Sequence, residues 1–307
     1  MKARIVLCAM ALAAAGLAAQ AGMGIQYKGS VKIEGGAAEQ QRQQMQKMSP
    51  EEREQMRKMG ISMEGAEGYD FLAEADGGKY KMTYLTPFMM FPKGSYMLGD
   101  SKTKMAYFVF PDKKKYSEMD LDKMESMARS MKVSISNGKC TVTPLPPKLI
   151  GGEMCPGKRV EISYDSEATV MGFHSKAHEE QKTDYYTSSK YDASTLFGGR
   201  NWQNMGTVTG DAAFDAQIKS KVGFLGFPIQ VVMHHTANGK DMGTTTLTTT
   251  DVQMRPFTPG HFDLPAGYTR TQMGFGQMTQ GGDDEGEEGQ QNQQQPSLKD
   301  ILKGLGH

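Results

Sequence analysis

Alternation of hydrophobic and polar residues is the main pattern along the chain. Between Ile25 and Ile33 every second residue except Gly29 is apolar, and the residues between are polar. This is the period-two pattern of a strand with one buried face. The same alternation recurs over 160–164 and, in more polar form, over 182–187, while 105–110 is a continuous apolar segment that ends at Pro111. These segments predict β-strands.

Three short polar segments predict tight hairpin turns between such strands. They are Asp76-Gly77-Gly78, Asn137-Gly138 and Asn238-Gly239, each flanked by apolar segments. Roughly ten strands follow from this pattern, without the strand–helix–strand rhythm of a parallel sheet. The predicted fold class is therefore mainly β (α+β), with an antiparallel sheet whose few helices cover or plug its concave side.

Helical patterns interrupt the strands at three places. An insertion over about 37–60 is rich in Gln, Glu and Met, and it restarts at Ser49 with the signals of a capped helix. A second helix is predicted from Ser117 to about Met131, and a third over 211–219. The second helix places Leu121, Met124, Met127 and Met131 on an apolar stripe, which we interpret as core or as contact with a hydrophobic ligand.

Both ends of the chain differ from this pattern. Residues 1–21 have a positive start, an apolar segment over 5–17 and a small-residue cleavage site before Gly22, so they predict a signal peptide. We therefore expect one β domain over 22–276, located in the periplasm, with no transmembrane segment after cleavage. Residues 277–296 are rich in Gly, Gln and acidic residues and predict a disordered tail. Residues 297–307 could form a short amphipathic segment, either a frayed end or a docking peptide for an envelope protein.

Charge excludes one class of partner. The chain has 35 Lys and Arg and 35 Asp and Glu, and loss of Lys2 and Arg4 with the signal leaves a formal charge of 0 − 2 = −2. This balance lacks the basic surface that nucleic-acid binding requires. We expect no nucleic-acid partner.

Cysteine usage follows from export. Cys8 leaves with the signal, so Cys140 and Cys155 remain, 15 positions apart. In an oxidising compartment such a pair most simply forms a disulfide, which would stabilise the fold by roughly 3 kcal/mol. The alternative is a redox-active or metal-binding pair, but neither a C-x-x-C spacing nor a nearby His supports it.

Methionine, with 25 residues, is unusually frequent. Met56, Met59 and Met63 have the same helical spacing as Met124, Met127 and Met131, and such stripes can bind Cu(I) through their sulfur atoms. The same spacing describes an ordinary apolar helix face. We predict core or lipid contact and keep soft-metal handling as the alternative.

Histidine and acidic residues give weaker candidates. His174 and His178 would lie about 13 Å apart in a strand, too far for one ion. In a helix they would lie one turn apart and could chelate a metal, but their polar neighbours favour a solvated loop. The Glu179-Glu180 pair is interpreted as a solvated face. His234 and His235 should point to opposite faces of a strand, one exposed and one packed. No metal site is predicted.

Signatures of catalysis and cofactor binding are missing from the sequence. It contains no Gly-x-Ser-x-Gly elbow, phosphate loop, dinucleotide fingerprint or His-Glu-x-x-His motif. We expect a protein that is not an enzyme and that uses no cofactor.

Several segments resemble an exported bacterial domain-of-unknown-function family. They are Tyr96-Met97-Leu98, Met105-Ala106-Tyr107, Asp112 to Met119, Leu149 to Cys155, Gly226 to Ile229 and Phe262 to Tyr268. That family is similar to periplasmic lipoprotein carriers of the LolA and LppX type, whose fold is a curved, half-closed antiparallel sheet with helices across its hollow. The resemblance implies a half-barrel cavity for acyl chains or another apolar ligand, and no catalytic residues. The insertion over 37–63 and the acidic tail depart from the carriers' pattern.

Three hypotheses follow. The first is a non-enzymatic periplasmic protein that binds a lipid or other apolar ligand. The second is copper handling by the Met stripes. The third is an envelope scaffold that recruits a partner through the C-terminal tail.

Overall fold

A computed structural model gives the fold over residues 23–36, 67–88, 90–121, 132–170, 173–191, 211–223 and 226–271, with isolated positions at 39, 43, 47–51 and 209. The predicted signal peptide (1–21), most of the helical insertion (37–60) and the C-terminal segments (277–296 and 297–307) lie outside them.

Strands make up most of the described chain. In chain order they are β1 (Gly24–Glu34), β2 (Gly68–Asp76), β3 (Lys79–Tyr84), β4 (Tyr96–Asp100), β5 (Met105–Phe110), β6 (Lys115–Asp120), β7 (Lys132–Ile150), β8 (Glu153–Val170), β9 (Phe173–Ser188), β10 (Phe227–Ala237), β11 (Lys240–Arg255) and β12 (Thr269–Arg270). A short 3-10 helix, η1 (Pro111–Lys113), joins β5 to β6, and an α-helix, α5 (Ala212–Val222), precedes β10.

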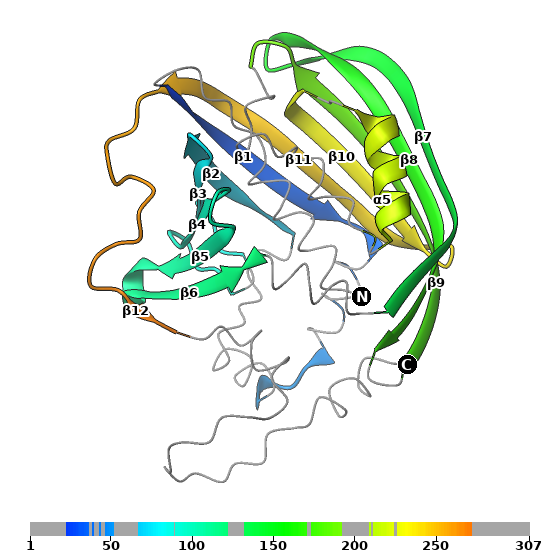
Figure 1. Ribbon diagram of the computed structural model, residues 1–307, viewed down its shortest axis with the longest axis horizontal. Helices are drawn as coiled ribbons and strands as arrows, with labels where there is room; N and C mark the ends of the chain where they lie inside the picture. The colour runs from blue at the N-terminus through cyan, green and yellow to red at the C-terminus, as the bar shows by residue number, and fades with distance from the viewer. Residues whose placement is uncertain are drawn as a thin grey trace.

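All these strands belong to one sheet, in the order β12-β6-β5-β4-β3-β2-β1-β11-β10-β9-β8-β7 (Figure 1). Neighbours are antiparallel, except that β12 runs parallel to β6. The chain enters in the middle of the sheet at β1, meanders out to β6, resumes at the opposite edge with β7 and returns to β11 beside β1. The sheet is open, with β7 and β12 at its edges. The prediction of a mainly β protein with a large antiparallel sheet and few helices is confirmed.

Two of the three predicted hairpin turns are confirmed. Gly77 and Gly78 join β2 to β3, and Asn238 and Gly239 join β10 to β11; all four have positive φ. The third prediction is wrong, because Asn137-Gly138 lies inside β7, where the register against β8 shifts between Ser136 and Lys139. A bulge and a tight turn both use a residue with positive φ, and Asn137 supplies it at 54°.

The hairpin between β7 and β8 turns at Gly151-Gly152 instead. Their φ angles of 57° and 82° are those of a two-residue turn of the kind that glycine favours. This turn leaves β7 and β8 as the longest strands of the sheet, 19 and 18 residues.

The helix predicted from Ser117 does not begin there. Ser117 lies in β6 opposite Phe108, and each residue of β6 has a partner in β5, so sheet pairing overrides the helical spacing. Leu121 directly follows β6, and its N–H donates to the carbonyl of Lys104 at 3.1 Å. The helix predicted over 211–219 is confirmed as α5, whose first turn is capped by the Asp211 carboxylate, which accepts from the N–H of Phe214 at 2.8 Å.

Strand alternation gives the sheet two different faces. The core face is the one on which Tyr27 and Val31 lie; the register places Phe71 of β2 and Leu247 of β11 on it. Its buried side chains include Ile25, Tyr27, Val31, Tyr69, Phe71, Tyr80, Met82, Tyr84, Val231 and Leu247. The outer face carries the residues between them, such as the exposed Lys28 and Lys32.

Each face has a different cover. Helix α5 packs over β7 and β8 on the core face (Figure 1). On the outer face a strap, residues 256–271, runs from the end of β11 to β12, orange in Figure 1. The strap is tied down by the Lys79–Asp263 ion pair at 3.0 Å and by the Arg270–Glu118 pair at 3.1 Å.

Candidate functional site

The centre of the core face is a continuous aromatic cluster. The ring of Tyr27 lies edge-on to Phe227 of β10, with 5.5 Å between centroids, and Tyr191 contacts the same Phe227 ring at 5.1 Å. Tyr69 extends the cluster toward the β3 side. Aromatic pairs with this spacing add to the free energy of area burial. The cluster therefore joins both halves of the sheet across β1.

A loop between β3 and β4 covers one end of this cluster. Phe88 and Phe91 exchange two backbone hydrogen bonds of 2.8 Å, which fixes both rings over the sheet. Phe88 lies 4.3 Å from the Tyr69 ring, and Phe91 stacks on Tyr84 at 4.9 Å. Burial raises the pKa of Tyr84, and that of Tyr80 to about 12, so both phenols are neutral at physiological pH.

Helix α5 covers the other end. Phe214 lies 5.8 Å from the ring of Tyr164 on β8, and Ile218 and Val222 are buried beside it. Lys221 donates to the carbonyl of Cys140 at 2.9 Å. Only these three apolar side chains of the helix are buried, so its anchorage to the sheet is small.

One polar pair lies on the core face among these apolar residues. His235 Nε2 and Glu179 Oε2 are 2.7 Å apart, joining β10 to β9, and Glu179 is only 7% exposed. His235 Nδ1 is buried and has no hydrogen-bond partner among the described residues. This pair is one of the polar groups that a ligand on the core face would meet, as is the buried hydroxyl of Thr249.

Glu179 corrects one sequence interpretation. The Glu179-Glu180 pair was expected to be solvated, but only Glu180 is exposed. Strand alternation predicts this burial, because Glu179 is an even number of positions from the buried residues Ala177, Thr183 and Tyr185 and so lies on the same face of β9. His234 and His235 lie on opposite faces, as expected, but both are partly buried, with side chains 42% and 22% exposed.

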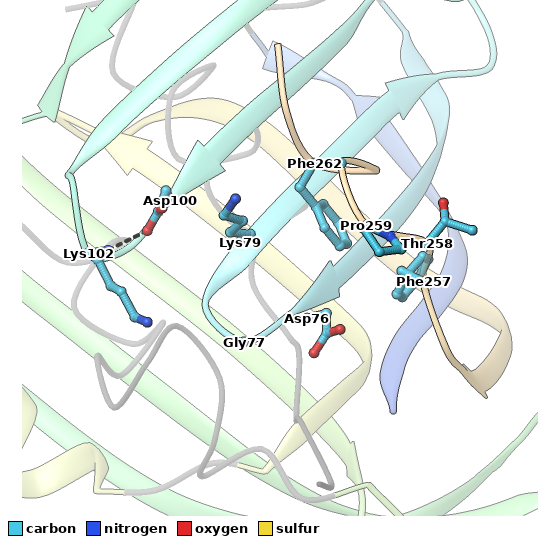
Figure 2. A pocket seen from close by; sticks show the side chains of 10 residues that line it. Asp76, Gly77, Lys79, Asp100, Lys102, Phe257, Thr258, Pro259 and Phe262 are labelled. Atoms are coloured by element: carbon cyan, nitrogen blue, oxygen red, sulfur yellow. Dashed lines mark hydrogen bonds between the residues drawn. The ribbon is translucent and has the colours of Figure 1, made fainter. Parts of the chain in front are cut away.

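A cleft of about 360 Å³ lies on the outer side, between the strap and the ends of two hairpins (Figure 2). Lys79, Asp76 and Asp100 line it from the sheet, and Phe257 and Phe262 line it from the strap. The Asp100 carboxylate is engaged by the N–H of Lys102 at 2.7 Å, and Lys79 by Asp263. Lys79 and Asp100 are therefore already engaged within the protein.

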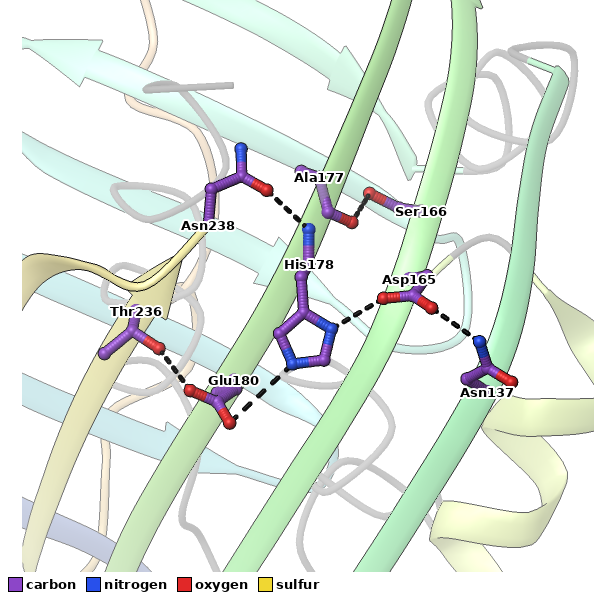
Figure 3. A network of polar contacts seen from close by, with 8 residues as sticks. All are labelled: Asn137, Asp165, Ser166, Ala177, His178, Glu180, Thr236 and Asn238. Carbon is purple, nitrogen blue, oxygen red and sulfur yellow. Dashed lines mark hydrogen bonds and ion pairs between the residues drawn. The ribbon is translucent and has the colours of Figure 1, made fainter.

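The outer face of β8 and β9 carries a polar network (Figure 3). His178 Nδ1 lies 2.6 Å from Asp165 Oδ1, and Asn137 donates to the other oxygen of Asp165 at 2.6 Å. Glu180 lies 3.7 Å from His178 Nε2. The hydrogen bond and charge of Asp165 raise the pKa of His178, and the bonds from Asn137 and His178 lower the pKa of Asp165.

This network is structural rather than metal-binding in form. No group of three potential ligands of a metal ion is found in the described part of the chain. His178 is instead fixed by its backbone, which exchanges hydrogen bonds with Asn238 at 2.8 and 2.7 Å. The side chain of His174 lies outside the described residues.

The predicted disulfide between Cys140 and Cys155 is not formed in the structure, where both are buried free thiols. Cys140 faces Ile162 across the β7–β8 pair, whereas Cys155 faces Lys148. Cys155 and Ile162 are 162 − 155 = 7 residues apart on β8, which is about 23 Å of strand. A disulfide requires Cα atoms within about 7 Å. Burial raises the pKa of both thiols.

The predicted methionine sites have no structural description. Met124, Met127 and Met131, like Met56, Met59 and Met63, lie outside the described residues. Of the stripe Leu121, Met124, Met127 and Met131, only Leu121 is described, and it is partly buried after β6. Core contact, lipid contact and copper binding by these residues all stay predictions.

Within the described residues, no helix has the length and apolar character needed to cross a membrane.

Comparisons with known proteins add little to this description. No protein-family model matches the chain, and no curated protein matches it either. Among solved structures, it is similar to the crystal structure of an uncharacterized conserved protein from Thermus thermophilus, with a TM-score of 0.32 and 7% sequence identity. The alignment covers 88% of this chain and 98% of that one. A likeness at this level carries no argument about fold family or function.

Proposed function

We propose that the protein is a non-enzymatic periplasmic protein that binds a lipid or another apolar ligand on the core face of its sheet, in the manner of a LolA-like half-barrel. The observation that carries the proposal is the open sheet itself. It presents one apolar, aromatic face from β5 to β8 without closing into a barrel. Ligand sites of this kind are lined mostly by apolar side chains with a few polar groups.

Access is best supported beside α5. An 11-residue helix is too short to be stable by itself, and α5 adds only three buried apolar side chains to the core. Local opening of such an element requires much less free energy than global unfolding. Lifting α5 would uncover Tyr164 and the strands beneath it, so a ligand enters there.

The Glu179–His235 pair supports an amphipathic ligand. Tyr164, which contacts α5, lies directly opposite Glu179 in the register of β8 and β9. A hydroxyl or carboxyl head group that reached this position would meet the unpartnered Nδ1 of His235. The apolar tail would then lie along the core face.

Short-range fluorescence quenching by a brominated fatty acid tests the proposal. Trp202, the single tryptophan of the sequence, is first replaced by Phe to remove the background. Tyr164→Trp then places a reporter on the core face, and Ser163→Trp places one at the next position of the same strand, on the outer face. Saturable quenching is expected in the Tyr164→Trp variant only. Native mass spectrometry of protein purified from its own envelope should show a bound apolar molecule.

Two results would contradict the proposal. One is equal quenching of both reporters, which indicates contact without preference for the core face. The other is a ligand-free mass spectrum together with no quenching of either reporter. Thermal melts of both variants establish that the fold is kept.

A further inference from the structure

The tip of the β7–β8 hairpin carries an unusual pair of exposed apolar side chains. Leu149 is 65% exposed and Met154 is 60% exposed. They lie directly opposite each other in the β7–β8 register, next to the Gly151-Gly152 turn, so their side chains project together. Among the described residues only one other large apolar side chain, Met23, is exposed, at 39%. A single exposed apolar residue is ordinary, but a paired projection at a tip is not.

Positive charge surrounds this tip. Lys148, Lys158 and Lys190 are all exposed. The acidic residue within 144–158 is Glu153, whose side chain is only 15% exposed and contacts Lys190 at 3.2 Å. It also accepts a hydrogen bond of 2.6 Å from Ser188. The surface beside the apolar pair is therefore cationic.

We propose that this hairpin tip docks the protein onto an anionic lipid surface, with Leu149 and Met154 inserted between the lipids and the lysines on the head groups. Two side chains are far too small for a stable protein interface, which buries about 800 Å² on each partner. They are sufficient for an interfacial anchor, which combines a small apolar insertion with basic residues.

The geometry of the tip sets the depth of insertion. Backbone groups at the Gly151-Gly152 turn have no strand partner and must keep water or lipid head groups as hydrogen-bond partners. The pair therefore inserts only to the boundary between head groups and acyl chains. The ammonium group of Lys148 lies 5.4 Å above the Tyr186 ring and donates to Gln230 at 2.8 Å, so this lysine lies along the sheet beside the tip.

Vesicle co-sedimentation tests this proposal. The wild type and all variants are purified from the producing cell. N-terminal sequencing then establishes that they all begin at the same residue. Vesicles contain either phosphatidylcholine with phosphatidylglycerol or phosphatidylcholine alone. We expect binding to the first kind, weakened by salt. The double variant Leu149→Gln with Met154→Gln should bind at least tenfold more weakly, and Lys158→Gln severalfold more weakly.

Matched controls lie elsewhere on the same sheet. Met23→Gln removes the other exposed apolar side chain, and Lys240→Gln removes an exposed lysine at the β10–β11 hairpin, at the opposite end of the strands. Both should bind as the wild type does. Since all these side chains are exposed, thermal melts should be unchanged in every variant.

Three results would overturn the proposal. They are absence of wild-type binding to the anionic vesicles, equal binding by the Leu149/Met154 double variant, and equal binding to neutral vesicles. A dimer in solution that this double variant converts to a monomer would assign the tip to self-association instead. The assay contains no fatty-acid ligand, so its outcome is independent of the ligand-binding proposal.

Discussion

The contact between Gly138 and Phe214 gives the sharpest test of the fold. An added Cβ at Gly138 would lie 2.6, 2.7 and 3.0 Å from three carbons of the Phe214 ring on α5. Carbon atoms do not approach this closely, so Gly138→Ala must displace the Phe214 ring, the helix or the bulge. Overpacking of this kind costs about 1–3 kcal/mol. Because Gly138 does not have a positive φ, the substitution also reduces unfolded-chain entropy, which offsets about 0.4–1 kcal/mol.

We therefore expect Gly138→Ala to lower the free energy of unfolding by about 1–2 kcal/mol. Urea unfolding followed by circular dichroism measures this change. Phe214→Ala by itself should cost about 3–5 kcal/mol, because it leaves a cavity beneath α5. In the Phe214→Ala background the added methyl group has room, so Gly138→Ala should be neutral or slightly stabilising. The cycle then gives a coupling energy of about 1–3 kcal/mol.

Ser134→Ala, at an exposed position of the same strand, is the control and should have almost no effect. An equal cost of Gly138→Ala with and without the Phe214 ring would refute the reasoning. That result would mean that α5 does not pack on the β7 bulge, and it would favour the hairpin turn that the sequence predicts at Asn137-Gly138.

Three further predictions follow from the described side chains. The pKa of His178 is raised from 6.5, so the stability that its contact with Asp165 contributes is fully present below pH 6.5 and is lost as pH rises through the raised pKa. The pKa of Asp165 is lowered from 3.8, so the stability from this contact is present above pH 3.8 and is lost as pH falls through the lowered pKa. The loss of unfolding free energy in His178→Gln should accordingly be largest between pH 3.8 and 6.5, and a loss independent of pH in urea titrations would contradict it. Cys140 and Cys155 should resist iodoacetamide in the native protein, and both should react after denaturation without reductant. A protein mass two hydrogens below that of the free-thiol form, with no labelling after denaturation, would show that the predicted disulfide is present. Asp211→Ala should cost about 1 kcal/mol in thermal unfolding through loss of the α5 cap, with Asp211→Asn much closer to wild type, and equal effects of both would exclude capping.

The β7 bulge illustrates why sequence reasoning stops short of the fold. Asn137-Gly138 and Asn238-Gly239 are the same dipeptide, and Asn adopts a positive φ in both. One makes a bulge and the other a hairpin turn. The difference lies in the strand pairing, since β8 pairs with β7 on both sides of Asn137, whereas β10 ends at Ala237 and pairs directly with β11 across the turn. A local pattern has no information about where a partner ends.

The candidate site shows the same limit. Strand alternation places both Tyr164 and Glu179 on the core face. It does not place His235 beside Glu179, because their strands pair only through a register set over the length of β9 and β10. Similarly, the spacing of Cys140 and Cys155 predicts a bond, but the long β7–β8 pair separates them along the strand axis.

Local patterns in the chain were enough to place most of the strand segments, the polarity of their two faces, two of the turns and helix α5, because each depends on residues close together in the sequence. The three-dimensional arrangement was needed to show that β1 enters between β2 and β11, that the sheet stays open, and that Leu149 and Met154 project side by side from one edge hairpin. These features depend on contacts between residues far apart in the chain. These features are decided by which strands pair with each other so that the apolar faces of all of them are buried together.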